Sequence, residues 1–226
     1  MEKDNRATPL TDISLELVPR SVAQLQADAR LVKDKFPRIT MVNVPDVLRL
    51  PVRSWHACSA VRGIFSRAIP HLRAMDIPLT EKSDILNEVR TLGLREVLVV
   101  GGDAPHDLKH LSYPTGSIDL IRWLKREFTD IKVFGAVDPY RQSLRGEMEY
   151  VRRKADAGAD GFFTQPVFDL RLLEIYAEAL SHWHIFWGIT PIVTDGARSY
   201  WETTNNVVLP KDFNQTMEWN QTLARA

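Results

Sequence analysis

The sequence has little cysteine, no excess of charge of either sign and no long apolar run. Its single cysteine, Cys58, excludes an internal disulfide framework and is typical of a protein from a reducing compartment. The 29 basic and 29 acidic residues cancel, so no net charge attracts the chain to nucleic acid or to an anionic membrane. No apolar stretch is long enough to cross a membrane, and residues 1–9 lack the apolar core of a signal peptide. We therefore expect a cytoplasmic protein with no nucleic-acid or membrane partner.

What the sequence does contain is a regular alternation of short apolar runs and amphipathic segments. The run at 96–103 (EVLVVGGD) is continuously apolar before its glycines, which is typical of a strand buried on both faces. The expected strands are 12–19, 38–45, 69–75, 96–103, 132–138, 161–167 and 185–192. The expected helices are 21–36, 55–68, a segment around 85–92 ended by Gly93, 118–128, 147–157, a segment capped by Asp169, 197–204 and 213–224.

Strict alternation of strand and helix predicts a parallel sheet with right-handed crossovers. Seven such units favour an α/β fold of the (β/α)8 TIM-barrel type, formed as one domain over 1–226. A doubly wound sheet is disfavoured, because its first turn is normally glycine-rich and this one reads Leu-Val-Pro-Arg-Ser. The eighth strand of the barrel is not evident. We expect either a truncated C-terminus or a barrel that is closed in another way.

In a parallel barrel the chemistry lies at the carboxyl ends of the strands. The polar residues at those ends are, in order, Glu16, Asn43, His71, Asp103, Asp138, Gln165 and Thr190.

Three of these residues are the strongest candidates, and each has a plainer alternative. Glu16 lies in an otherwise apolar strand, so it is either paired with an arginine or catalytic. Asp103 follows two glycines that would let a ligand approach the backbone, although a simple turn explains the same pattern. Gln165 either binds a ligand or caps its strand. No metal site is expected, because His106 and His110 have helical spacing but no evident third ligand.

Together, the motifs at these strand ends resemble the methylenetetrahydrofolate reductase family. The best block is KADAGADGFFTQPVFD at 154–169, which resembles the family's K-x-D-A-G-A-D-…-T-Q-…-F-D. Supporting matches follow in the family's order over nearly the whole chain: SLELVP at 14–19, IPHL at 69–72, VLVVGGD at 97–103, SIDLI at 117–121 and GITPI at 188–192. No single motif is specific, but their order and spacing are.

The resemblance implies a (β/α) barrel that uses FAD to reduce 5,10-methylenetetrahydrofolate to 5-methyltetrahydrofolate, or to run the reverse oxidation, in one-carbon and methionine metabolism. By that resemblance Glu16 protonates the folate to open its methylene bridge, Asp103 lies near the flavin and the pterin, and Gln165 binds the pterin. The residues that it assigns to the flavin and its phosphates are His71, Gly102, Ala136, Glu147, Arg153 and Lys154.

The sequence also departs from the family pattern. Gly101 stands where the family has an arginine before Gly-Asp, and NVPDVLRLPVRSW at 43–55 replaces a usual segment after the second strand. These departures leave NAD(P)H open as electron donor. Two functions follow: a flavin-dependent reductase, and a non-redox folate-binding barrel that serves a methyltransferase system as a partner subunit. The expected partners are a folate substrate and either a second copy of the chain or a redox or methyltransferase protein.

Overall fold

The computed structural model describes residues 12–80, 83–103 and 110–225. Contacts within the chain divide it into two compact units. The first comprises the chain up to His71 together with Glu88–Leu94, and the second comprises Leu72–Asn87 and the chain from Arg95 onward. That the two form one domain stays a prediction.

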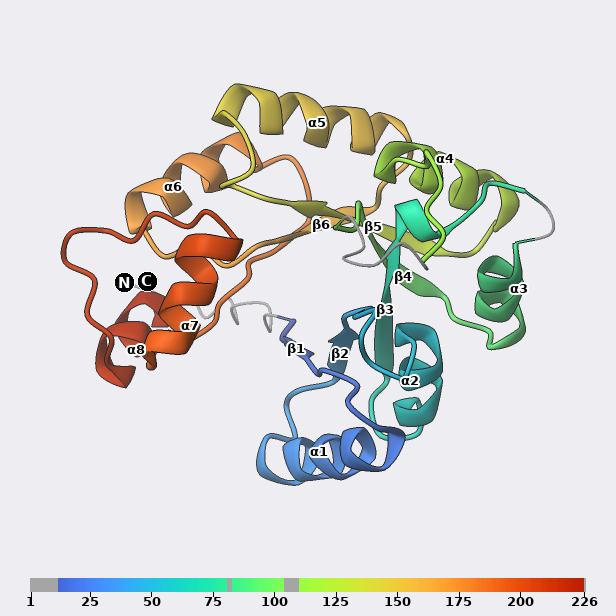
Figure 1. Cartoon of the computed structure of the whole chain (residues 1–226), viewed down its shortest axis with the longest axis horizontal. Coiled ribbons are helices and arrows are strands. Elements are labelled where there is room, and N and C mark those ends of the chain that lie inside the picture. The colour runs from blue at the N-terminus through green and yellow to red at the C-terminus, as the bar shows by residue number, and fades with distance from the viewer. Residues whose placement is uncertain (1–11, 81–82, 104–109, 226) are drawn as a thin grey trace, which may run out of the picture. The chain divides into compact units, whose positions relative to one another are not determined.

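The described residues form seven strands that follow one another in sequence order (Figure 1). They are β1 (Ser14–Glu16), β2 (Met41–Val44), β3 (Arg67–Arg73), β4 (Glu96–Val100), β5 (Lys132–Val137), β6 (Gly161–Thr164) and β7 (Ile185–Phe186). Every pairing within a unit is parallel. The predicted α/β fold of the TIM-barrel type is confirmed, and no eighth strand occurs among the described residues.

Helices occupy the connections between the strands, as a parallel sheet requires. They are α1 (Val22–Lys35), α2 (Ser54–Val61), α3 (Asp84–Thr91), α4 (Ser117–Glu127), α5 (Leu144–Asp156), α6 (Leu170–Ala179), α7 (Asp195–Ser199) and α8 (Met217–Arg225). A 3-10 turn, Ala74–Asp76, follows β3, and a π-helical turn, Tyr200–Thr204, follows α7.

The first unit pairs β1 with β2 and β2 with β3, and Glu16 stands opposite Asn43 in the register. All four residues of β2 are buried, which agrees with a strand covered on both faces. Cys58 lies on α2 with no exposed surface, and burial raises the pKa of its thiol. It is therefore a packing residue and not a nucleophile.

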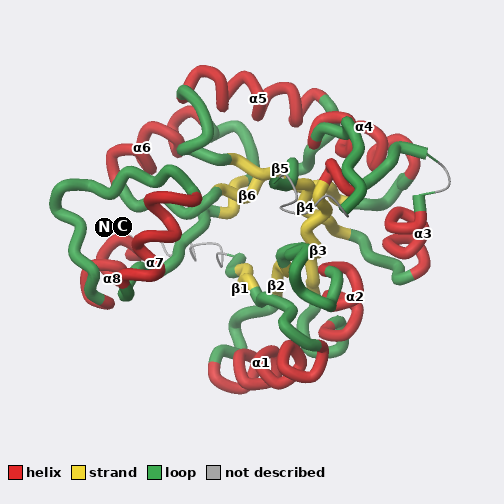
Figure 2. The backbone as a smooth tube through the Cα atoms, viewed as in Figure 1, coloured by secondary structure: helices red, strands yellow, loops and turns green. Residues whose placement is uncertain are grey.

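In the second unit, α4, α5 and α6 lie along one side of β4, β5 and β6 (Figure 2). Phe162 packs on that side with Val151 of α5 and Tyr176 of α6. Successive side chains of a strand point to opposite faces, so Phe163 lies on the other face. There its ring stacks on Phe186 of β7, with ring centroids 4.3 Å apart. The two faces of this sheet are thus both apolar.

The last predicted strand, 185–192, is much shorter than expected. Its ladder ends at Phe186, and the next backbone groups bond to side chains instead of a strand. Gly188 N–H donates to Thr164 Oγ1 at 2.9 Å, and Ile192 N–H donates to Asn220 Oδ1 of α8 at 3.0 Å. Asn220 Nδ2 also donates to the Ile192 carbonyl at 3.2 Å. The Asn220 amide therefore makes the hydrogen bonds to the Ile192 backbone that a neighbouring strand would make in a longer ladder.

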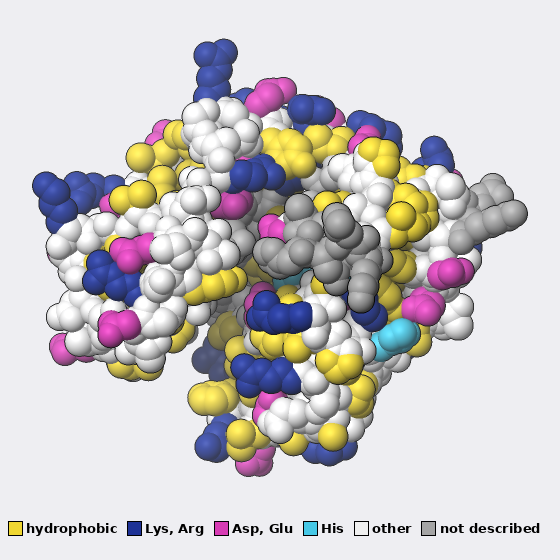
Figure 3. All heavy atoms as spheres, in the orientation of Figure 1, with side chains coloured by type: hydrophobic (Ala, Val, Ile, Leu, Met, Phe, Trp, Pro, Cys, Tyr) yellow, Lys and Arg dark blue, Asp and Glu magenta, His cyan; other side chains and the backbone are white. Residues whose placement is uncertain are grey.

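The surface carries both signs of charge. On the face shown in Figure 3, basic and acidic side chains are interspersed, in keeping with the balanced composition. None of the described helices is long and apolar enough to cross a membrane.

Gly188 sits where the chain after β7 passes close to the end of β6. A Cβ at this position would lie 2.5 Å from the Thr164 carbonyl oxygen and 2.9 Å from the Pro166 nitrogen. Because both obstacles are backbone atoms, Gly188→Ala is expected to lower the free energy of unfolding by about 2 kcal/mol or more. Chemical denaturation of the purified variants measures this difference.

Gly196 of α7 provides the matched control, because a Cβ there would meet no atom within 4 Å. Gly196→Ala is expected to keep or slightly raise stability, since alanine is the better helix former. Equal stability of the two variants would show that the segment after β7 does not pass β6 as described.

Candidate functional site

Three strands of the first unit are joined by a row of polar side chains. Asn43 Nδ2 donates to Ser14 Oγ at 2.9 Å, and Asn43 Oδ1 lies 2.9 Å from His71 Nε2. Because the amide presents its oxygen, the ring nitrogen must carry the proton in this contact. Desolvation lowers the pKa of His71 to about 4, so the imidazole is neutral near pH 7. His71 is thereby fixed as a neutral group at the end of β3.

Glu16 is the last residue of β1 and is exposed to solvent. Surrounding protein nevertheless desolvates the carboxyl group and raises its pKa above the ordinary value. Within the described ranges no ion pair of Glu16 is found, which argues against the arginine-paired alternative. A carboxyl group with a raised pKa holds its proton at higher pH, which is the property of a general acid.

Gly101 and Gly102 directly follow β4. Gly102 has a φ of +92°, a backbone conformation that favours glycine. The Gly101 carbonyl accepts a hydrogen bond from Met75 N–H at 3.2 Å. Asp103 follows, exposed to solvent, and its carboxylate has no partner among the residues that the structure describes. It is therefore available to a ligand.

Gln165 immediately follows β6. Its backbone N–H donates to the Val137 carbonyl of β5 at 2.8 Å, which fixes the residue at the edge of the sheet. Its half-buried side chain makes no hydrogen bond within the described part of the chain. Asp103 and Gln165 follow strands that flank β5, so two strand spacings, about 10 Å, separate the ends of their strands. The structure thus brings two unpartnered polar side chains to one edge of the sheet of the second unit.

Beside them, the first turn of α5 forms a closed polar network around Glu147, whose side chain is fully buried. Glu147 Oε2 accepts from Arg141 Nη2 at 2.7 Å and from Gln142 Nε2 at 2.8 Å. Glu147 Oε1 accepts from the Asp138 N–H at 3.1 Å. Burial also raises the pKa of Asp138. Both oxygens of Glu147 are therefore used inside the protein.

Lys154 of α5 is also buried, at 2% exposure. Its ammonium donates to the Ala136 carbonyl of β5 and lies 4.0 Å from the centre of the Tyr150 ring. Desolvation lowers the pKa of this lysine to about 8, although the Glu147 carboxylate acts in the opposite direction. Lys154 thus links α5 to β5 through a hydrogen bond.

These contacts do not fit the flavin phosphate site that the sequence predicts. A diphosphate needs cations that are free to pair with it, whereas Lys154 is engaged internally and Glu147 is an anion. Arg153 is exposed on α5, directly beside the buried Lys154. A Cβ on Gly102 would meet Met75 and Arg73 at 3.0–3.3 Å. The space left by the missing side chain is therefore occupied by these two residues and not by a ligand. The predicted roles of these residues toward FAD, and those of His71 and Ala136, stay predictions.

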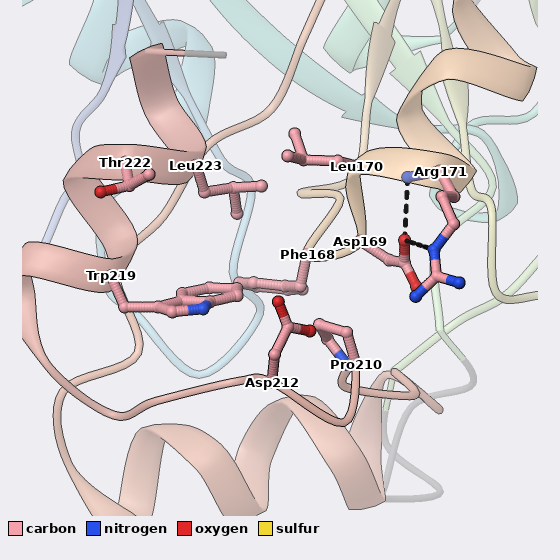
Figure 4. A pocket seen from close by; sticks show the side chains of 9 residues that line it. All are labelled: Phe168, Asp169, Leu170, Arg171, Pro210, Asp212, Trp219, Thr222 and Leu223. Carbon is pink, nitrogen blue, oxygen red and sulfur yellow. Dashed lines mark hydrogen bonds and ion pairs between the residues drawn. The ribbon is translucent and has the colours of Figure 1, made fainter.

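A cavity of about 250 Å³ lies where the loop after β6 meets α8 (Figure 4). Phe168, Trp219, Asp212 and Leu223 are among the residues that line it (Figure 4). Asp169 also lines the cavity, where its Oδ1 caps α6 by accepting from Arg171 N–H at 2.8 Å. Two carboxylates suit neither a phosphate nor the glutamyl tail of a folate, so we do not include this cavity in the candidate site.

The sequence analysis missed the residues that hydrogen-bond or pack against the site residues. They are Arg73, Asp76, Arg141, Gln142 and Tyr150. The one signal for Arg73 and Asp76 was charge at the end of a buried strand and just after it, where burial requires a partner. Of the predicted histidine pair, His106 lies outside the described residues. Among the described residues, no group of three or more His, Cys, Asp or Glu side chains could hold a metal ion.

Comparison with known proteins agrees with this fold. The 5,10-methylenetetrahydrofolate reductase of Buchnera aphidicola is 28% identical over 150 residues, 63% of this chain and 50% of that protein. Methylenetetrahydrofolate reductase 2 of Saccharomyces cerevisiae is 25% identical over 167 residues, 66% of this chain and 27% of that protein. The chain therefore spans half or less of these relatives.

Among solved structures, an uncharacterized protein from Clostridium thermocellum, which binds two copies of 5-methyl-5,6,7,8-tetrahydrofolic acid, superposes with a TM-score of 0.64. The match covers 95% of this chain and 80% of that one at 11% identity, so the likeness shows the fold alone. The sequence pattern described as methylenetetrahydrofolate reductase, in contrast, matches residues 21–222. Because this match covers most of the sequence, the chain belongs to the methylenetetrahydrofolate reductase family.

Proposed function

We propose that this protein binds a reduced folate and interconverts its 5,10-methylene and 5-methyl forms. The observation that carries the proposal is the pair of unpartnered side chains, Asp103 and Gln165, at one edge of the sheet in a chain of this family. The solved structure from Clostridium thermocellum supports the choice of ligand, because a protein of the same fold binds 5-methyltetrahydrofolate.

The chemistry of the two side chains suits a pterin ring. The Gln165 amide offers a donor and an acceptor side by side, which match the alternating acceptor and donor atoms along the edge of the pterin. The Asp103 carboxylate accepts hydrogen bonds only, so it selects N–H groups of the ligand. We assign the orientation of the folate to these two residues.

The family resemblance assigns the role of proton donor to Glu16 of the first unit. Opening the five-membered ring of the methylene form requires a proton on the departing nitrogen, N10, and leaves a reactive iminium on N5. Because desolvation raises the pKa of Glu16, a larger fraction of the carboxyl group is protonated near neutral pH than in water. In the reverse direction its carboxylate takes the proton back.

The redox step requires an electron carrier, and FAD is the carrier that the family resemblance implies. FAD supplies hydride transfer when bound. Of the α5 residues that the resemblance assigns to the flavin and its phosphates, Glu147 and Lys154 do not fit that role, since both are buried and internally satisfied. We therefore place no step of the reaction on them.

A second candidate function follows from the same observation. A folate-binding protein without redox chemistry, acting as partner of a methyltransferase, needs the pterin contacts but no phosphate site. The closed network on α5 and the glycine at position 101 favour this candidate. The visible absorbance of protein incubated with FAD and freed of excess flavin separates the two: bound flavin supports the reductase, and folate binding without flavin supports the second function.

The folate proposal predicts a specific loss of affinity at Gln165. Gln165→Leu keeps the approximate size of the side chain but removes two hydrogen-bonding groups. The dissociation constant for 5-methyltetrahydrofolate, measured by titration calorimetry, is expected to rise about tenfold or more. Gln24→Leu on α1 is the control, because the exposed Gln24 side chain donates to Asp28 of the same helix. Unchanged affinity in Gln165→Leu, or no binding by the wild-type protein, would contradict the proposal.

The role of Glu16 predicts a pH dependence. The protonated acid is lost as the pH rises through its raised pKa, so turnover of the methylene form should fall over that range. Glu16→Gln cannot donate a proton, so its turnover is expected to be about 10²–10⁴-fold lower and to lack this pH limb, with folate affinity retained. Steady-state assays across pH, with calorimetry for binding, measure both effects. Turnover within about twofold of wild type would reject this assignment.

A further inference from the structure

We propose that Arg73 is a positioning residue that holds Asp103 in place for the folate. The inference rests on the proposed function for the ligand, but the clamp itself can be tested without any ligand. It concerns the end of β3, one residue beyond the motif His71–Leu72 that the sequence analysis identified.

The Arg73 guanidinium donates to two protein oxygens and also contacts Met75 Sδ at 3.6 Å. Its Nη2 donates to the Asp103 carbonyl at 2.7 Å, and its Nε donates to Asp76 Oδ2 at 3.0 Å. Side-chain exposure is 9% for Arg73 and 4% for Asp76, so this ion pair is largely shielded from water. A planar guanidinium held by a buried carboxylate has little freedom, and its remaining donors point in fixed directions. One of them fixes the backbone of Asp103.

Asp76 also contacts a residue that comes later in the chain than Asp103. His110 Nε2 lies 3.3 Å from Asp76 Oδ1. Asp103 and His110 are thus both tied to the Arg73–Asp76 pair, the first through its carbonyl and the second through its ring. A purely stabilising ion pair has no need to contact both of these positions.

Gly102 makes this close approach possible. A Cβ at Gly102 would lie 3.3 Å from Arg73 Cζ and 3.0 Å from both Cγ and Sδ of Met75. Because Gly102 has no side chain, its backbone can lie close to the Arg73 guanidinium. At Gly101, in contrast, a Cβ would meet nothing within 4 Å.

This contrast accounts for the departure noted in the sequence. The family resemblance has an arginine at the position of Gly101, immediately before Gly-Asp. Here that position is bare, and the guanidinium beside Gly102 and Asp103 comes instead from Arg73 of β3. In this chain the Arg73 guanidinium orients Asp103 from within the protein.

The experiment is a double-mutant cycle between Arg73 and Asp103, read as the dissociation constant for 5-methyltetrahydrofolate. Arg73→Lys keeps the charge but cannot make both bonds in the same geometry, so it is expected to weaken binding about tenfold. If Arg73 acts through Asp103, the same change in an Asp103→Ala background is expected to alter affinity by less than about twofold. An equal loss in both backgrounds, or no loss in either, would overturn the inference.

Hydrogen exchange of the ligand-free protein provides the independent measurement. The Met75 amide, whose N–H donates to the Gly101 carbonyl, is expected to exchange about tenfold faster in Arg73→Lys than in wild type. Arg95→Lys is the control, because Arg95 forms an exposed ion pair with Asp130. If Arg73→Lys does not fold, Asp76→Asn replaces it, since loss of the carboxylate also frees the guanidinium.

The two measurements separate the possible failures. Faster exchange in a protein that binds no folate would uphold the clamp and reject the proposed function. Unchanged exchange would reject the clamp, whatever the protein binds.

Discussion

The parallel hydrogen bonding of β4, β5, β6 and β7 is the constraint on which the second unit depends. It aligns the carboxyl ends of the strands, so that whatever follows each strand arrives at the same edge. Asp103 and Gln165 share an edge for this reason, although 61 positions separate them in the sequence. The outward-facing aromatic and aliphatic side chains pack on α5 and α6 and hold the ladder in register. Function in this unit therefore depends on the side chains that follow the carboxyl ends of the strands.

The buried charged side chains near that edge have protein partners. Arg73 pairs with Asp76, the fully buried Glu147 pairs with the partly exposed Arg141, and Lys154 donates to a carbonyl and lies over an aromatic ring. Removing one partner of such a pair leaves an uncompensated charge, which is costly inside a protein. The polar groups inside are thus committed to structure, and the side chains left without protein partners are the ones available to a ligand.

The sequence was informative wherever the signal is local. Gly93 follows α3 with a φ of +60°, as its place after an amphipathic run predicted. The last strand was overestimated because Ile192 is bound by Asn220, a residue 28 positions away that no local pattern connects to it. The roles of Glu147 and Lys154 were likewise not predictable in full, since motif matching shows position but not which groups become buried and paired. Local patterns therefore located the strand ends, and tertiary contacts decided which of their side chains stay available.

A crystal structure of the protein grown with 5-methyltetrahydrofolate tests the central claim most directly. The account predicts the pterin ring at the edge of the second unit, with the Gln165 amide and the Asp103 carboxylate in hydrogen-bonding contact and the Arg73 bond to the Asp103 carbonyl intact. Folate bound elsewhere, for example beside Phe168 and Trp219, or no folate at saturating concentration, would contradict it.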